Sequence, residues 1–174
     1  MTVERIGSRT VYEGQIASVR IDEFRHADGS KATRQVVAHP GAVAVVAHDG
    51  ETLYLVRQPR EAVGEESLLE LPAGKLDVPG EKPLDCARRE LAEEIGHEAS
   101  EWRELKRLYT SPGFAEEEVI VYVATGLRRI GHEPDAEERI EVVEWPLAEL
   151  DSAIAECRDA KSLVGMLLFR DELR

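Results

Sequence analysis

The sequence predicts an α+β fold, in which helices cover a mixed β-sheet as an α/β/α sandwich and an antiparallel strand region lies at the N-terminal end. Three observations predict it. Strand-like runs dominate the first third of the chain, one strongly amphipathic helical pattern lies in the middle, and strand-like runs return before two final helical segments. Strands with only a few helices favour a sheet covered by helices. With 174 residues, the chain can bury roughly two thirds of its unfolded surface.

Four extended segments are expected before the first helix. The segment Ile16–Asp22 alternates between apolar and polar residues, and Lys31–Val37 is also extended. The apolar runs Ala42–Ala47 and Thr52–Val56 follow, separated by a turn that contains Asp49-Gly50, a dipeptide typical of hairpins. These two runs are therefore expected to pair.

The central helix is predicted over residues 83–95. Pro83 suits the first turn of a helix, and Gly96 is a typical stop. At roughly 100° per residue, four apolar side chains fall within about 80° of arc and must face a core. They are Leu84, Ala87, Leu91 and Ile95.

Three further strands and two further helices are expected. The strands are Leu105–Tyr109, Val119–Ala124 and Ile140–Trp145. Pro146 is expected to open a helix that runs to about residue 157, and residues 162–174 form the last helix. The apolar face of that last helix is expected to contain Leu163, Met166, Leu167 and Leu173.

Composition excludes several classes of protein. The 35 acidic residues outnumber the 22 Lys and Arg, giving a net charge of −13, which disfavours nonspecific nucleic-acid binding. The longest uncharged stretch, Val36–His48, is too short to cross a bilayer, so no membrane association is expected. The first residues lack a secretory signal, which predicts a cytoplasmic protein. Two cysteines without a Cys/His cluster predict neither a disulfide framework nor zinc.

Three carboxylates share one flank of the central helix. Glu90, Glu93 and Glu94 spread over roughly 100° beside the apolar stripe. Like charges at these spacings cost about 0.2 to 0.5 kcal/mol per pair, so a compensating cation is expected, and Arg88 or Arg89 can supply it. A helix flank of this kind is either a solvated acidic surface or a set of hard oxygen ligands for a divalent cation.

The surrounding spacing favours the second interpretation. The segment reads Gly74-x6-Glu81-x7-Arg89-Glu90-Leu91-x-Glu93-Glu94-x-Gly96. It resembles the Nudix box, whose usual form has five residues between the first Gly and Glu and an aliphatic residue after the last Gly. This chain has one extra residue between Gly74 and Glu81, and His97 at the final position. Neither departure removes a carboxylate.

The resemblance implies a Nudix-type sandwich that binds Mg²⁺, with Mn²⁺ as a substitute. The implied metal ligands are Ala73 through its carbonyl, Glu90, Glu93, Glu94 and Glu138. In the family, the arginine at the position of Arg89 pairs with a carboxylate and keeps the helix in register, so Arg89 and Glu81 are structural candidates. The glycine at the position of Gly74 allows close approach of the backbone.

Other segments resemble the ADP-ribose pyrophosphatase-like subfamily, over about residues 10–165. They are residues 34–43, Glu70-Leu71-Pro72-Ala73-Gly74 and Ser111-Pro112-Gly113-Phe114. The resemblance implies hydrolysis of ADP-ribose, or a related nucleoside diphosphate sugar, into AMP and ribose 5-phosphate or their equivalents. The candidate substrate-binding residues are Arg34, Arg60, Gly74, Ser111 and Gly113. It also implies a homodimer, with residues 1–40 as a strand region for dimerisation and 41–174 as the Nudix hydrolase domain.

The catalytic base is expected in the acidic segment 133–138. Several members of the subfamily have their base at the position of Ala136, so Glu137 is the first candidate here and Glu133 the second. If neither acts, Glu93 or Glu94 can activate water directly, as in shorter family members.

Two alternative functions stay open. The first is a Nudix hydrolase for another sugar nucleotide or a dinucleotide. The second is a noncatalytic ADP-ribose sensor. Such sensors usually have an added DNA-binding module and a degraded box, and these 174 residues show neither.

Overall fold

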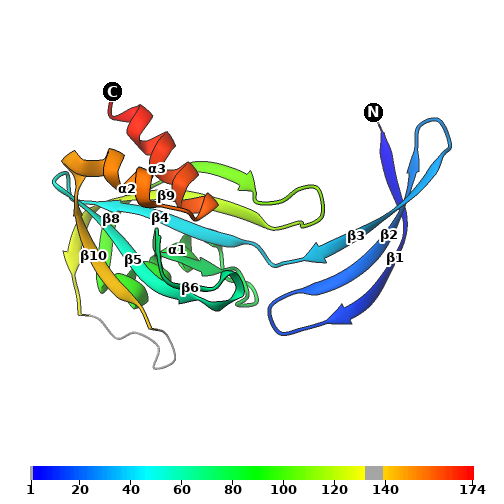
Figure 1. Ribbon diagram of the computed structural model, residues 1–174, viewed down its shortest axis with the longest axis horizontal. Coiled ribbons are helices and arrows are strands. Elements are labelled where there is room, and N and C mark those ends of the chain that lie inside the picture. The colour runs from blue at the N-terminus through cyan, green and yellow to red at the C-terminus, as the bar shows by residue number, and fades with distance from the viewer. Residues whose placement is uncertain (1, 132–138) are drawn as a thin grey trace. The chain divides into compact units, whose positions relative to one another are not determined.

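The computed structural model describes residues 2–131 and 139–174. It divides into two compact units (Figure 1). The first contains the chain up to Gly41 together with Tyr109–Glu118, and the second contains Ala42–Leu108 and Val119–Arg174.

The first unit is an antiparallel sheet of three strands in the order β1-β2-β3. The strands are β1 (Val3–Glu13), β2 (Ser18–His26) and β3 (Lys31–Ala38). The sequence predicted the second and third strands but not β1. The segment around Ala115 adds to the edge of β3, because the Val37 N–H donates to the Phe114 carbonyl at 2.8 Å and the Glu116 N–H donates to the Val37 carbonyl at 3.1 Å.

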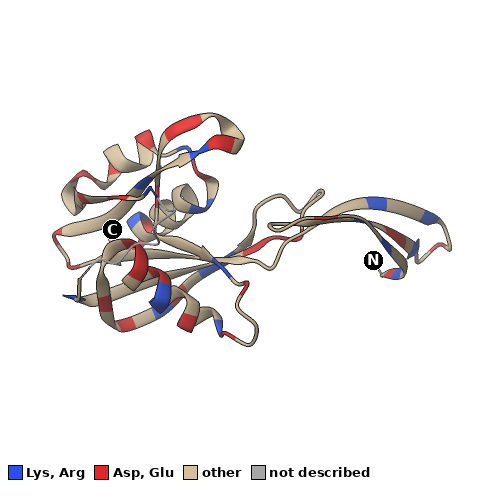
Figure 2. Ribbon diagram, turned by 90° about the horizontal axis from the view of Figure 1, so that it is seen from below, with Lys and Arg blue, Asp and Glu red and all other residues tan. Residues whose placement is uncertain are grey.

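Charged contacts, rather than an apolar core, connect the side chains of this sheet. No apolar side chain is buried among the described residues of the first unit, whereas Asp22 is buried. Its carboxylate accepts hydrogen bonds from the Ser8 hydroxyl at 2.6 Å and from Arg20 Nε at 2.8 Å. Burial alone would raise the pKa of Asp22, but these hydrogen bonds outweigh it and hold the pKa below its usual value. Both signs of charge occur along this sheet (Figure 2).

The second unit is built on a sheet with the order β10-β5-β4-β9-β8, in which β6 also pairs with β5 and β7 with β4. β4 and β9 are parallel, while the pairings β10–β5, β4–β5, β5–β6 and β4–β7 are antiparallel, so the sheet is mixed as expected. The strands are β4 (Ala42–His48), β5 (Thr52–Arg60), β6 (Glu65–Glu70), β7 (Ala73–Lys75), β8 (His97–Tyr109), β9 (Glu118–Arg129) and β10 (Glu141–Pro146). The helices are α1 (Pro83–Ile95), α2 (Leu150–Glu156) and α3 (Ala160–Glu172), with short 3-10 turns at Glu61–Val63 and Leu147–Glu149.

Helices cover both faces of this sheet (Figure 1). Strand β4 is buried on both sides and alternates between two hydrophobic clusters. Ala44 and Val46 face the cluster that contains residues of α2 and α3. Val43 and Val45 face the cluster that contains the apolar stripe of α1. This arrangement is the predicted α/β/α sandwich.

The central helix has the predicted bounds, whereas the C-terminal helices differ from the prediction. Gly96 ends α1 with a positive φ of 67°, which a glycine adopts without strain. Pro146 is the last residue of β10, where it pairs with Thr52 of β5, and it also opens the predicted helical segment as the N-cap of the 3-10 turn that leads into α2. On α3, Phe169 is buried, but Leu173 at the C-terminal end is 53 % exposed and does not belong to the core. Among the described residues, no helix is long and apolar enough to span a membrane.

Candidate active site

Helix α1 and strand β7 bring Gly74 and Glu90 of the motif into contact. A Cβ atom placed on Gly74 would lie 1.9 Å from both Cδ and Oε1 of Glu90, far inside van der Waals contact. Only a residue without a side chain therefore leaves room for the Glu90 carboxylate in this position. The extra residue between Gly74 and Glu81 does not prevent this approach.

Arg89 is the cation that compensates the acidic flank. Its Nε and Nη2 donate to the two carboxylate oxygens of Glu81 at 3.0 and 3.2 Å. Its Nη1 donates to Oε1 of Glu90 at 2.7 Å and to Oε2 of Glu93 at 2.8 Å. The hydrogen bonds from Arg89 hold the pKa of Glu81 below its usual value. Arg88, the other candidate, pairs with Asp85 at 3.2 Å instead.

Glu94 is buried and accepts a backbone hydrogen bond. The Ala73 N–H donates to Oε2 of Glu94 at 2.9 Å. The structure thus connects α1 to the peptide just before Gly74 through Glu94. The sequence predicted the Ala73 carbonyl as a metal ligand. The hydrogen bond to Glu94 is made by the N–H of the same residue.

The carboxylates of α1 have the chemistry that a hard cation requires. Carboxylate oxygens suit Mg²⁺ or Mn²⁺, and Glu90, Glu93 and Glu94 lie within one turn or so of the same helix. Glu93 is 47 % exposed and its carboxylate contacts Arg89. In the part of the chain that is described, no three His, Cys, Asp or Glu residues are already arranged as a metal site. Carboxylate oxygens are the type of ligand that Mg²⁺ or Mn²⁺ prefers. The roles of these three glutamates as metal ligands stay predictions.

Arg60, a candidate substrate-binding residue, is held by Glu70, which was not among the predicted site residues. Its Nε and Nη2 donate to Oε1 and Oε2 of Glu70 at 2.6 and 2.9 Å. The Glu70 side chain is 1 % exposed and also accepts from Nζ of Lys161 at 2.6 Å. The sequence signal was present, because Glu70 interrupts the apolar run Leu68–Leu71.

Acid is expected to remove the contribution of Glu70 to stability. Burial alone would raise the pKa of Glu70, but hydrogen bonds from Arg60 and the charge of Lys161 outweigh it and lower the pKa below its ordinary value of 4.5. A lowered folded-state pKa stabilises the protein above about pH 4.5, and that contribution is lost as the pH falls through the folded-state value. In urea unfolding, wild type should exceed Glu70→Gln in stability at pH 7, and the difference should shrink below about pH 4.5.

The control for this experiment is Glu66→Gln, at an exposed position of the same strand. Its difference from wild type should stay within about 0.5 kcal/mol across the same pH range. A stability difference for Glu70→Gln that does not change with pH would contradict the assignment.

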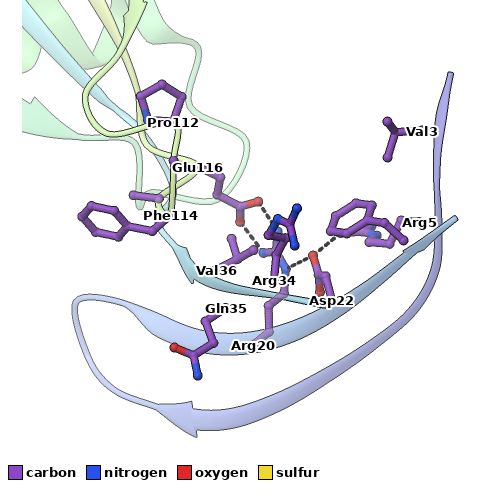
Figure 3. Close-up of a pocket in the computed structure, with 13 residues that line it drawn as sticks. Val3, Arg5, Arg20, Asp22, Arg34, Gln35, Val36, Pro112, Phe114 and Glu116 are labelled. Atoms are coloured by element: carbon purple, nitrogen blue, oxygen red, sulfur yellow. Dashed lines mark hydrogen bonds and ion pairs between the residues drawn. The ribbon is translucent and has the colours of Figure 1, made fainter. Parts of the chain in front are cut away.

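The remaining described candidates belong to the first unit. Arg34 and Gly113 line a pocket of about 470 Å³, together with Phe114, Arg20 and Glu116 among others (Figure 3). Arg20 Nη1 donates to Oε1 of Glu116 at 2.5 Å, so it holds the segment that contains Gly113.

Ser111 is not among the residues that line this pocket, and it belongs to a tight turn. Its carbonyl accepts from the N–H groups of Phe114 and Ala115 at 3.0 and 2.8 Å. Three acidic candidates, Glu133, Glu137 and Glu138, lie outside the described residues. Their roles stay predictions.

Comparisons with known proteins agree with the motif. The NUDIX domain model matches residues 38–163. The chain is 48 % identical over 150 residues to an ADP-ribose pyrophosphatase from Mycobacterium tuberculosis, covering 84 % of this chain and 72 % of that protein. It is 36 % identical over 166 residues to a methanol dehydrogenase activator from Bacillus methanolicus, covering 92 % and 89 %.

A solved structure shares the fold as well. The crystal structure of an ADP compounds hydrolase superposes with a TM-score of 0.85 and 25 % identity, covering 99 % of this chain and 95 % of that one. The family prediction made from the carboxylate spacing is confirmed, and the chain belongs to the NUDIX domain family.

Proposed function

We propose that this protein hydrolyses the pyrophosphate bond of ADP-ribose or a related nucleoside diphosphate sugar. The products are a nucleoside monophosphate, AMP for ADP-ribose, and a sugar phosphate, here ribose 5-phosphate. Mg²⁺ is the proposed cofactor, and Mn²⁺ can substitute for it.

The observation that supports this proposal most directly is the fit between Gly74 and Glu90. A glycine that touches a carboxylate, next to an arginine that neutralises the same carboxylate, is more than a solvated acidic helix requires. The similarity to an ADP-ribose pyrophosphatase supports the choice of substrate class.

The residues of α1 have distinct roles in the proposed reaction. Glu90, Glu93 and Glu94 would hold the metal ions, with the Ala73 carbonyl and Glu138 as further ligands. When bound, Mg²⁺ neutralises the substrate diphosphate and the charge that develops on it. Arg89 keeps Glu90 and Glu93 together on one side of the helix.

Outside the helix, Arg60 is proposed to contact the diphosphate, and Arg34, Ser111 and Gly113 to contact the rest of the substrate. Glu137 is the first candidate for the base that takes a proton from the attacking water, and Glu133 is the second. Glu93 or Glu94 would take this role if both are dispensable.

Glu90→Gln tests the central assignment. Replacing the carboxylate by an amide removes one negative ligand without changing its size, so Mg²⁺-dependent release of AMP from ADP-ribose should fall about 100-fold or more. Release of AMP is measured by chromatography over a range of Mg²⁺ concentrations. The matched control is Asp85→Asn, an exposed carboxylate of the same helix, which should retain wild-type turnover. Unchanged turnover in Glu90→Gln would contradict the metal assignment.

A panel of substrates at equal concentration separates the alternatives. ADP-ribose, GDP-mannose, NADH and a diadenosine polyphosphate cover nucleoside diphosphate sugars and dinucleotides. The highest kcat/KM identifies the class, and preference for GDP-mannose or NADH would favour the alternative hydrolase. Binding of ADP-ribose without turnover at any Mg²⁺ or Mn²⁺ concentration would favour the sensor.

A homodimer is part of the proposal. Strands of the first unit expose Val11 and Tyr12, and Ile16 is exposed in the turn that follows, an apolar content that suits a protein interface. The cytoplasmic location and the absence of nucleic-acid and membrane partners stay predictions.

A further inference from the structure

A polar network centred on the buried carboxylate of Glu70 connects the end of β5, the end of β6 and the start of α3. We call it the Glu70 network. Its members are Arg60, Glu70, Leu71, Asp159, Lys161 and Ser162. Buried charges are costly unless they are paired and hydrogen-bonded, so a network of this kind needs an explanation in terms of either folding or function.

The guanidinium of Arg60 is held by one edge. Nε and Nη2 form a bidentate pair with Glu70, the geometry in which a carboxylate fixes an arginine most firmly. Nη1 forms no hydrogen bond within the described part of the chain, and the side chain is 40 % exposed. One end of the guanidinium is therefore oriented by the protein, while the other can meet an anion.

Arg60 is also linked to Glu94, one of the carboxylates of the candidate site. The charge of Glu94, which accepts the Ala73 N–H, contributes to raising the pKa of Arg60, after the hydrogen bond and charge of Glu70. Along the backbone, Glu70 lies three residues before Ala73, whose N–H donates to Glu94, so the residue that orients Arg60 is attached to the strand segment that contacts α1.

Glu70 is itself fixed from the opposite side. Lys161 Nζ lies 2.6 Å from Oε2 of Glu70 and 2.9 Å from Oδ2 of Asp159. Asp159 caps α3 by accepting from the Ser162 N–H at 3.0 Å and from its hydroxyl at 2.6 Å. The Ser162 hydroxyl in turn accepts from the Leu71 N–H at 2.8 Å, which anchors the residue next to Glu70. Both the carboxylate and its backbone are thus attached to α3.

We propose that Glu70 is a positioning residue that, held by Lys161, orients the guanidinium of Arg60 so that Nη1 binds the substrate diphosphate. This inference rests on the proposed function. The geometry that supports it is the bidentate pair with Glu70, which uses Nε and Nη2 and leaves Nη1 for an anion.

The test is a double-mutant cycle on substrate binding without catalysis. Binding of ADP-ribose is measured by calorimetry in EDTA for wild type, Arg60→Ala, Glu70→Gln and the double variant. Each single variant should weaken binding roughly tenfold, and the double variant should bind no more weakly than Arg60→Ala, because Glu70 acts only through Arg60. In the Mg²⁺-dependent assay, Glu70→Gln should raise KM for ADP-ribose more than it lowers kcat.

Two further variants keep the test decisive. Glu65→Gln, at the start of the same strand and paired with Arg158 on the surface, is the matched control and should bind as wild type does. Arg60→Lys keeps the positive charge but removes the planar guanidinium that can bind Glu70 and an anion at once. This variant should therefore lose about as much affinity for ADP-ribose as Arg60→Ala. It remains informative if Glu70→Gln does not fold.

The outcomes separate this inference from the proposed function. Wild-type affinity in Glu70→Gln or Arg60→Lys, or additive losses in the double variant, would overturn the positioning role even if wild type hydrolyses ADP-ribose. Wild-type affinity in Arg60→Ala would overturn the role of Arg60 itself. A wild-type protein that binds ADP-ribose through Arg60 and Glu70 but releases no AMP would instead contradict the proposed hydrolysis.

Discussion

Gly74→Ala is expected to reduce turnover of ADP-ribose about 100-fold or more while the protein stays folded. The new methyl group would occupy the space of the Glu90 carboxylate, at 1.9 Å from Cδ and 2.3 Å from Cγ. The Glu90 side chain is flexible and can rotate away, which keeps the cost in stability small but moves the carboxylate from its position. Misplacement of a group by about 1 Å can cost roughly 100-fold in rate. Turnover and thermal unfolding are measured on the same preparation.

Gly7→Ala is the matched control for this substitution. Gly7 lies in β1, and a Cβ there would meet its nearest atom, Oε2 of Glu23, at an ordinary distance of 3.5 Å. Gly7→Ala should keep wild-type turnover. If Gly74→Ala also keeps wild-type turnover, the close contact between Gly74 and Glu90 is not needed for catalysis.

Leu91→Ala is expected to lower the free energy of unfolding by about 2 to 5 kcal/mol. Leu91 is 0 % exposed and lies in the cluster between α1 and the sheet, so truncation removes buried apolar contacts and leaves a cavity. Urea unfolding at pH 7, followed by circular dichroism, measures the change.

The same truncation at the end of α3 provides the comparison. Leu173 was expected on the apolar face of the last helix, but it is 53 % exposed. Leu173→Ala should therefore change the free energy of unfolding by no more than about 0.5 kcal/mol. Equal losses for the two variants would contradict the packing described for both helices.

Local signals explain why the central helix was predictable. Pro83, Gly96 and the apolar stripe act within a few residues of one another, so they define α1 without knowledge of the rest of the chain. The spacing of the carboxylates then indicated the family. The same spacing correctly required a cation beside them, and Arg89 is that cation.

Features that depend on distant partners were not predictable in the same way. Lys161 and Glu70 are separated by 91 positions, and nothing near either residue indicates the other. Strand β1 has only exposed or half-buried residues and therefore lacks a clear apolar alternation. Pro146 suits either a strand end or a helix start, and its pairing with β5 adds the strand role to the predicted helix start.

The contacts of Arg89 also bear on how a metal ion would enter the family motif. Because the single positive charge of Arg89 lies against Glu81, Glu90 and Glu93, the protein itself offsets part of their mutual repulsion. Loading of the proposed divalent cation would then be a binding event on a preassembled helix, unlike zinc fingers, whose folding requires the metal. With Glu90 as a metal ligand, as proposed above, the cation would share Glu90 with Arg89, and its affinity would include the rearrangement of that ion pair.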